Sequence, residues 1–137
     1  MSKIEIFYEG GFSTRSVHLE SGAEIFTDAP KDNQGKGEKF SPTDLLALSL
    51  GSCLLTILGI RAEKLGVDIS GSKVFVNKEM SLDLPRRIVK IQAHFVCPRV
   101  FTTEVQEKLE KAAMQCPVHY SLHPELQQEF SFEWGVS

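Results

Sequence analysis

The stretch Ser41-Pro42-Thr43-Asp44-Leu45-Leu46, which continues as ALSLGSCLLTILGIRAEKLG to Gly66, decides the fold of this chain. Ser41 suits the N-cap of a helix, Pro42 its first position and Asp44 its third. Gly66 suits the position just past the C-terminus, where a left-handed backbone is common. The pattern therefore predicts a helix over residues 42–65, which would be about 36 Å long.

Apolar residues fall on nearly every face of this segment as far as Ile60, which predicts a helix surrounded by protein on most sides. The uncharged part, Leu45 to Ile60, has 16 residues. A bilayer span needs about 20, so we expect a core helix rather than a membrane segment. A chain of 137 residues has little protein with which to enclose so long an apolar helix. A second copy of the chain would complete the enclosure, which predicts an intertwined homodimer.

The regions on either side of the helix predict a mixed α+β chain forming a single domain, residues 1–137. Before the helix, alternating patterns predict a β-meander, and a polar loop follows it. After the helix, we expect a β-hairpin, a second helix capped by Thr102 or Thr103, a short turn of helix at Cys116-Pro117 and a final strand. The expected strands are residues 3–8, 15–19 and 24–27 in the meander, 67–81 and 86–96 in the hairpin, and 130–134 at the end.

Composition narrows the class of function. Hydrophobic residues make up 42% and charged residues 24% of the chain, which is typical of a packed globular domain. The net charge of −3 argues against nucleic-acid binding, which needs a basic surface. The start of the sequence lacks the pattern of a secretory signal, so we expect a cytoplasmic protein. Three cysteines in that setting predict reduced or catalytic thiols rather than a disulfide scaffold.

Each cysteine has a structural and a functional interpretation. Cys53, in the middle of the apolar helix, is either a small buried hydrophobe or a reactive thiol. It lies 11 residues past Pro42, too far for the helix N-terminus to activate it, so a cation would have to come from elsewhere. Cys116 precedes Pro117 and either caps a helical turn, whose N–H groups favour a thiolate, or marks a break between helices. Cys97 ends a strand, and we interpret it as structural.

Two other kinds of site are disfavoured. His94, Cys97, Cys116 and His119 form an HxxC…CxxH set with the ligand count of a zinc site. However, residues three apart on a strand point to opposite faces, and the sequence has no CxxC pair. No G-x-S-x-G motif of a serine hydrolase occurs either. We therefore predict no metal.

Two landmarks resemble the OsmC/Ohr family. In that family a Pro-led central helix carries one cysteine about three turns in, and a second cysteine follows an amphipathic helix near the C-terminus. The matching segments here are Thr27-Asp28-Ala29-Pro30, Gly35 through Leu46, Gly51-Ser52-Cys53 with Thr56, and Cys116-Pro117. The resemblance extends in element order over nearly the whole chain. It implies an intertwined homodimer with two long helices buried between β-sheets.

The resemblance also implies a function. Family members reduce organic hydroperoxides or hydrogen peroxide with thiols and no metal or other cofactor, as part of the oxidative stress response. When the family's roles are carried over to the matching positions, Cys53 is the peroxidatic thiol and Cys116 is the resolving thiol that forms a disulfide with it. The disulfide is reduced by an external dithiol, usually a dihydrolipoyl group. Arg15, the only arginine before the helix, matches the arginine that the family places against the reactive thiolate.

One position departs from the family pattern. Hydroperoxide-resistance proteins have a glutamate just after the helix-opening proline, and it pairs with the arginine. Thr43 stands there in this chain, and Asp44 or Glu38 are the acidic residues nearest to replacing it. The departure motivates an alternative hypothesis, in which the chain is a non-catalytic stress protein that binds a small apolar ligand.

Overall fold

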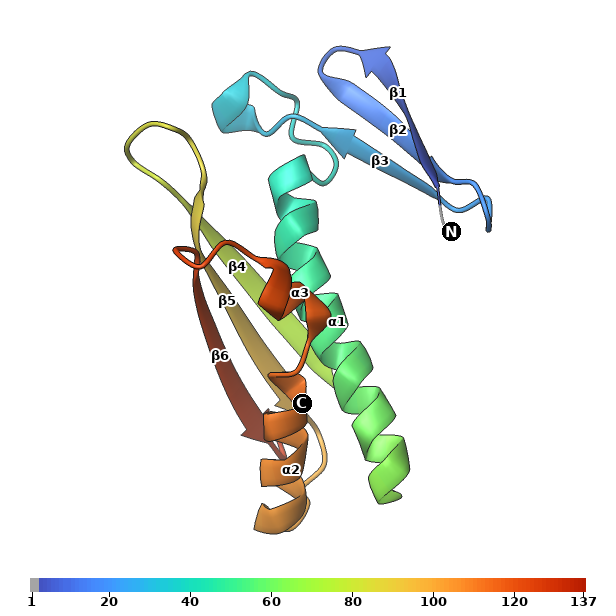
Figure 1. Ribbon diagram of the computed structural model, residues 1–137, viewed down its shortest axis with the longest axis vertical. Helices are drawn as coiled ribbons and strands as arrows, with labels where there is room; N and C mark the ends of the chain where they lie inside the picture. Colours follow the sequence, from blue (N-terminus) through green and yellow to red (C-terminus); the bar gives the residue numbers. More distant parts are fainter. Residues whose placement is uncertain (1–2) are drawn as a thin grey trace. The chain divides into compact units, whose positions relative to one another are not determined.

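The computed structural model describes residues 3–137, which fold into two compact units that divide between Leu46 and Ala47. Each unit contains one three-stranded sheet, and the long helix α1 begins in the first unit and continues through the second (Figure 1). The predicted α+β class and element order are confirmed. The organisation as one domain stays a prediction.

The first unit is the predicted β-meander. Its sheet has the order β1-β2-β3, and both pairs of neighbouring strands are antiparallel. Gly10 and Gly11 have φ angles of 85° and 61°, which glycine adopts readily and which turn β1 back into β2. A short 3-10 helix, η1, interrupts the loop between β3 and α1. The elements are β1 (Ile4–Gly10), β2 (Ser13–His18), β3 (Glu24–Asp28) and η1 (Lys31–Asn33).

The loop before α1 is folded tightly against the end of β3. The backbone N–H of Asp28 donates to the carbonyl oxygen of Phe40 (3.1 Å), and that of Gly37 donates to the carbonyl of Ala29 (3.2 Å). A Cβ atom at Gly35 would lie 1.7 Å from the same Ala29 oxygen, so only glycine fits there. These contacts fix the path by which the chain enters α1.

The helix α1 (Pro42–Leu65) has the predicted bounds. Ser41 and Asp44 form a reciprocal capping box: the Asp44 N–H donates to Ser41 Oγ (3.0 Å), and the Ser41 N–H donates to the Asp44 carboxylate (2.9 Å). At the other end, Gly66 has φ 72° and its N–H donates to the carbonyl of Glu63. Every signal for this helix lies within or next to it, which is why its bounds could be predicted.

The second unit packs its helices on one face of its sheet (Figure 1). The strand order is β4-β5-β6, with β4 and β5 antiparallel and β5 and β6 parallel. The predicted strand 67–81 is wrong at its start, because Asp68 forms a side-chain turn that accepts the N–H (2.9 Å) and hydroxyl (2.6 Å) of Ser70. The elements are β4 (Lys73–Met80), β5 (Ile88–Cys97), α2 (Thr103–Ala113), α3 (Pro117–Ser121) and β6 (Gln127–Trp134).

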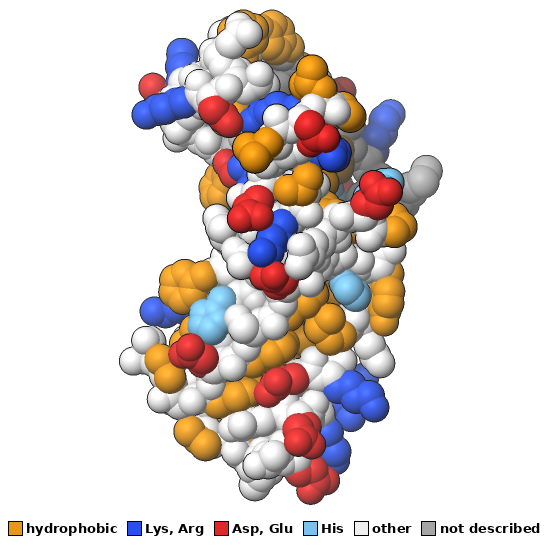
Figure 2. Space-filling model, turned by 90° about the vertical axis from the view of Figure 1, so that its left-hand side faces the viewer, with side chains coloured by type: hydrophobic (Ala, Val, Ile, Leu, Met, Phe, Trp, Pro, Cys, Tyr) orange, Lys and Arg blue, Asp and Glu red, His pale blue; other side chains and the backbone are white. Residues whose placement is uncertain are grey.

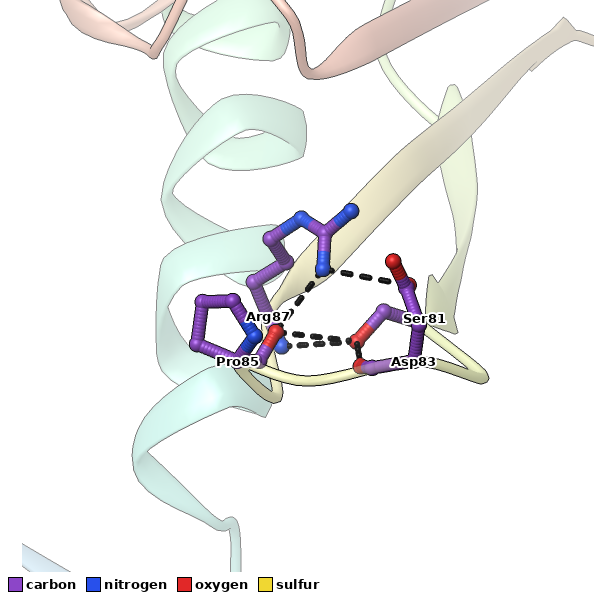
Figure 3. A network of polar contacts seen from close by, with 4 residues as sticks. All are labelled: Ser81, Asp83, Pro85 and Arg87. Carbon is purple, nitrogen blue, oxygen red and sulfur yellow. Dashed lines mark hydrogen bonds and ion pairs between the residues drawn. The ribbon is translucent and has the colours of Figure 1, made fainter.

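A polar network closes the hairpin between β4 and β5 (Figure 3). The Ser81 hydroxyl donates to the carbonyl of Asp83 (2.9 Å) and accepts from the backbone N–H of Arg87 (3.0 Å). The Arg87 guanidinium donates to the Asp83 carboxylate (3.2 Å) and to the carbonyl of Pro85 (2.8 Å). These bonds order the turn that sets the pairing of the two strands.

The core of the second unit covers only one stripe of α1. Leu54 and Leu58 pack with Ala93 and Phe95 of β5 and with Leu109 of α2. One copy of the chain therefore leaves part of the helix uncovered, as expected, and enclosure of the helix on most sides by a second copy stays a prediction. Several apolar side chains of α1 are exposed, and hydrophobic side chains stand at the surface on the face drawn in Figure 2. The exposed apolar residues of α1 are Leu46, Leu48 and Ile60.

By length and composition alone, α1 passes the test for a membrane span, although the uncharged stretch counted from the sequence was too short. In its most apolar stretch of 18 residues, 33% of the residues are buried inside the structure. Leu50 and Leu58 are fully buried against the rest of the second unit. A core helix of a soluble protein passes the same test, so this finding is weak evidence for a membrane.

Gly51 allows α1 to approach β4 closely. A Cβ atom at this position would lie 2.6 Å from Val76 Cγ2 and 3.3 Å from Val74 Cγ1. Both neighbours are β-branched strand residues with little freedom to move. We therefore expect Gly51→Ala to lower the free energy of unfolding by about 1–3 kcal/mol, as overpacking does, in chemical denaturation.

Gly59 on the same helix is the matched control, because no heavy atom lies within 4 Å of a Cβ built there. Gly59→Ala should raise the free energy of unfolding by up to about 1 kcal/mol through helix propensity. Equal effects of the two substitutions would show that contact with β4 does not restrict residue 51.

Candidate thiol site

Cys53 and Cys116 meet inside the second unit. Cys53 comes from the middle of α1 and Cys116 from the residue before α3, and both pack in one apolar cluster with Leu50 and Ile91. Their side chains are hydrogen-bonded to each other, and both thiols are free. Cys116 is 1% exposed, whereas Cys53 is half-buried. The structure thus brings together the two cysteines that the sequence singled out.

Cys116 is the N-cap of α3, as predicted. Its Sγ accepts a hydrogen bond from the backbone N–H of His119 at 3.4 Å, and Pro117 occupies the first helical position. The backbone N–H groups at this position favour a thiolate, as expected, but they do not decide the acidity of Cys116. Burial first, and the hydrogen bond from Cys53 second, raise the pKa of Cys116 above its ordinary value, and the N–H groups of His119 and Val118 offset only part of this. The sequence revealed the cap but not the apolar surroundings.

The two thiols therefore differ in how readily they can react with a reagent from solvent. A raised pKa keeps Cys116 protonated at neutral pH, and its burial closes it to solutes. Cys53 is the more accessible of the pair. A reagent from solvent would meet Cys53 first, with Cys116 already in contact behind it.

Arg15 belongs to the first unit, where its partners are carboxylates of its own sheet. It pairs with Glu9 at 3.4 Å and with Glu24 at 3.2 Å, and its guanidinium lies 4.5 Å from the ring centre of Phe7. Phe7 is directly opposite Arg15 in the β1–β2 register, and the two glutamates lie on diagonals. Sequence reasoning missed both glutamates. The only signal for them was the register that the turns at Gly10-Gly11 and Ser21-Gly22 impose.

The residues considered as substitutes for the family's glutamate serve the helix start and the loop. Thr43 Oγ1 is 3.0 Å from Ser41 Oγ, and Asp44 forms the capping box with the same serine. Glu38 is exposed, and its backbone N–H binds the carboxylate of Asp28. A hydrogen bond from Ser13, more than any other contact, lowers the pKa of Asp28 from its ordinary value.

The four residues considered as zinc ligands do not come together. His94 bonds Ser131 through Nδ1 (2.6 Å), His119 bonds a glutamine of β6, and Cys97 packs in a different cluster from Cys116. Within residues 3–137, no three His, Cys, Asp or Glu side chains are grouped so that they could hold a metal ion.

Comparison with known proteins places this site in a family. The sequence profile of OsmC-like proteins matches residues 35–131, well over half of the chain and including both thiols of the pair. The chain belongs to the OsmC-like family. This confirms the resemblance found in the sequence. No curated protein matches the OsmC-like chain.

Solved structures agree with this membership. A proposed osmotic stress induced and detoxification response protein from Psychrobacter arcticus is 43% identical, covers 97% of this chain with 96% of its own, and superimposes with a TM-score of 0.92. Organic hydroperoxide resistance proteins have the same fold at lower identity. That of Legionella pneumophila is 11% identical (TM-score 0.76) and covers 97% of this chain with 96% of its own. That of Elizabethkingia anophelis is 16% identical (TM-score 0.77), with coverages of 98% and 96%.

The raised pKa of Cys116 in this OsmC-like chain gives a direct test. Cys53→Ala removes a hydrogen bond and a nearby charge that both raise the pKa of Cys116, and it opens space beside the buried sulfur. The pKa of Cys116 should therefore fall in this variant. The measurement is a pH titration of the Cβ chemical shift of isotope-labelled Cys116 by NMR.

Cys97→Ser provides the control, since Cys97 packs in the other cluster and should leave the titration of Cys116 unchanged. If the midpoint for Cys116 rises or stays constant in Cys53→Ala, the hydrogen bond between the two thiols does not control its ionisation.

Proposed function

We propose that this protein is a thiol-dependent peroxidase in which Cys53 reduces organic hydroperoxides or hydrogen peroxide and then forms a disulfide with Cys116. The observation that carries the proposal is the contact between a half-buried thiol and a fully buried one inside an apolar cluster. Apolar walls suit the organic part of a hydroperoxide. The second thiol stands where it can react as soon as the first is oxidised.

The chemistry balances with two thiols and one peroxide. The Cys53 thiolate attacks one peroxide oxygen, so that an S–O bond forms, the O–O bond breaks and the alkoxide leaves and takes up a proton as the alcohol. The sulfur of Cys53 is thereby oxidised by two electrons to a sulfenic acid. Cys116 sulfur then attacks it, the S–S bond forms, and the hydroxyl leaves as water with the proton of Cys116.

Turnover needs an external dithiol to reduce the disulfide, and a dihydrolipoyl group is the one expected for this family. The first step needs a cation near Cys53, because the helix N-terminus is remote. We assign that role to Arg15, which would stabilise the thiolate and hold the peroxide. The names of the Legionella and Elizabethkingia relatives, organic hydroperoxide resistance proteins, support a peroxide-related role for this chain.

Stoichiometric cumene hydroperoxide should consume two of the three thiols and produce a Cys53–Cys116 linkage. Intact-mass thiol counting before and after exposure, followed by peptide mapping, measures both results. Cys53→Ser should retain its thiols. Cys116→Ser should accumulate a Cys53 sulfenic acid, which dimedone traps, because no resolving thiol remains.

Cys97→Ser is the matched control and should react like the unaltered protein, since Cys97 lies outside the thiol cluster. Arg15→Gln should slow the loss of the Cys53 thiol without changing the linkage formed. Retention of all three thiols after prolonged exposure would overturn the proposal. The competing hypothesis, a non-catalytic stress protein that binds a small apolar ligand, would then lead.

We further propose that two copies of the chain form a homodimer. On β1, Ile4, Ile6 and Tyr8 share one face and are each more than 60% exposed, and the apolar residues of α1 described above are also uncovered. A three-stranded sheet needs a covered apolar face for stability. Two copies of the chain would supply that cover for each other.

Sedimentation should therefore give twice the mass of one chain at micromolar concentration. Ile6→Asp should shift the population toward monomer, because it places a charge in the apolar face of β1. Glu5→Lys, on the other face of the strand, is the control and should leave the mass unchanged. The proposal would be contradicted if the unaltered protein had the mass of one chain at every concentration.

A further inference from the structure

Two hydrogen bonds join α3 to β6 through one pair of side chains. The amide of Gln128 donates from Nε2 to the carbonyl oxygen of His119 (3.1 Å), and its Oε1 is 2.6 Å from Nδ1 of the same histidine. The carbonyl oxygen can only accept, which orients the amide and leaves its oxygen as the acceptor for the ring. Nδ1 of His119 therefore carries the proton, and the pair holds whether the ring is neutral or charged.

The residue that Gln128 holds is the one that contacts the buried thiol. The backbone N–H of His119 donates to Cys116 Sγ at 3.4 Å. The ring of His119 also packs edge-on against Phe130, with 5.5 Å between ring centroids, and Phe130 is part of the apolar cluster around Cys116. Main chain and ring of His119 are thus both attached to β6.

The turn that carries Cys116 has little stability of its own. The helix α3 has five residues, far fewer than an isolated helix needs in water. The loop after it leads directly into β6 (Figure 1). Its position must therefore come from its attachments, and the two bonds to Gln128 are side-chain bonds that reach across nine residues of sequence.

The side chain of His119 is bound to residues of β6. Nδ1 is engaged by Gln128. His119 meets Cys116 through its main chain, which is the part that Gln128 holds in place.

We propose that Gln128 is a positioning residue for closure of the Cys53–Cys116 disulfide, acting through His119 to fix the turn that presents Cys116 to Cys53. The inference rests on the proposed function, in which this disulfide forms after oxidation of Cys53. Closure brings two sulfurs to bonding distance, about 2.05 Å. A displacement of the order of 1 Å in such a step costs on the order of 100-fold in rate.

Diamide provides a test that needs no peroxide. This reagent accepts two electrons and two protons from a pair of thiols and leaves a disulfide and a hydrazine, so it drives the same closure. With saturating diamide, we expect Gln128→Met to close the Cys53–Cys116 disulfide on the order of tenfold more slowly than the unaltered protein. Methionine keeps the length of the side chain and removes both hydrogen bonds. The measurement is quenched alkylation with peptide-resolved mass spectrometry.

Substitutions of His119 separate a positioning role from a merely structural one. His119→Leu should close the disulfide as slowly as Gln128→Met does. His119→Asn places an amide N–H near the position of Nδ1 and should therefore restore most of the closure rate. Gln92→Ala is the matched control, because Gln92 also bonds side chains of neighbouring strands, and these partners, Asn77 and Glu129, lie on β4 and β6 rather than on α3. Hydrogen exchange at the backbone amide of residue 119 should quicken in the slow variants alone.

Closure of Gln128→Met at the unaltered rate would overturn the inference, as would equal slowing in His119→Asn and His119→Leu. The same holds if diamide fails to link the two cysteines in the unaltered protein. Failure of the proposed function is distinguishable: cumene hydroperoxide would then leave the thiols intact while diamide closure still depended on Gln128.

Discussion

The packing of α1 against the sheet of the second unit is the constraint on which the thiol site depends. Because Gly51 has no side chain, the helix lies close to Val76 of β4, and the buried stripe through Leu50 and Leu54 is pressed onto the sheet. An α-helix turns by about 100° per residue, so Cys53 lies about 60° from Leu50 around the axis. That places its thiol at the edge of the buried stripe, where Cys116 lies inward and solvent outward.

The parts of this arrangement that depend on local signals could be predicted from the sequence. Ser41, Asp44 and Gly66 fix the ends of α1 by contacts within a few residues, and Pro117 indicates the short turn at Cys116. The strand start near residue 67 was wrong because the turn at Asp68 is itself a local alternative to a strand. Where two local structures compete, a pattern of apolar residues does not decide between them.

Features that depend on distant segments could not be predicted. The parallel pairing of β5 with β6 joins strands separated by α2 and α3, and it places Gln128 beside His119. The pKa of Cys116 likewise depends on segments that are distant in the sequence. Its cap was visible in the sequence, but the burial that outweighs the cap comes from α1 and β5. A local motif therefore indicated the place of the thiol but did not decide its acidity.

Arg15 is paired with carboxylates of its own sheet. The family pattern takes the carboxylate partner of the arginine from the start of the helix, where this chain has Thr43 bonded to Ser41 instead. Here the carboxylates come from the sheet, through Glu9 and Glu24. A guanidinium that faces two carboxylates retains less positive field for a thiolate than one that faces a single partner. In the proposed function, the first step therefore depends on whether the peroxide or the thiolate displaces one of these glutamates from Arg15.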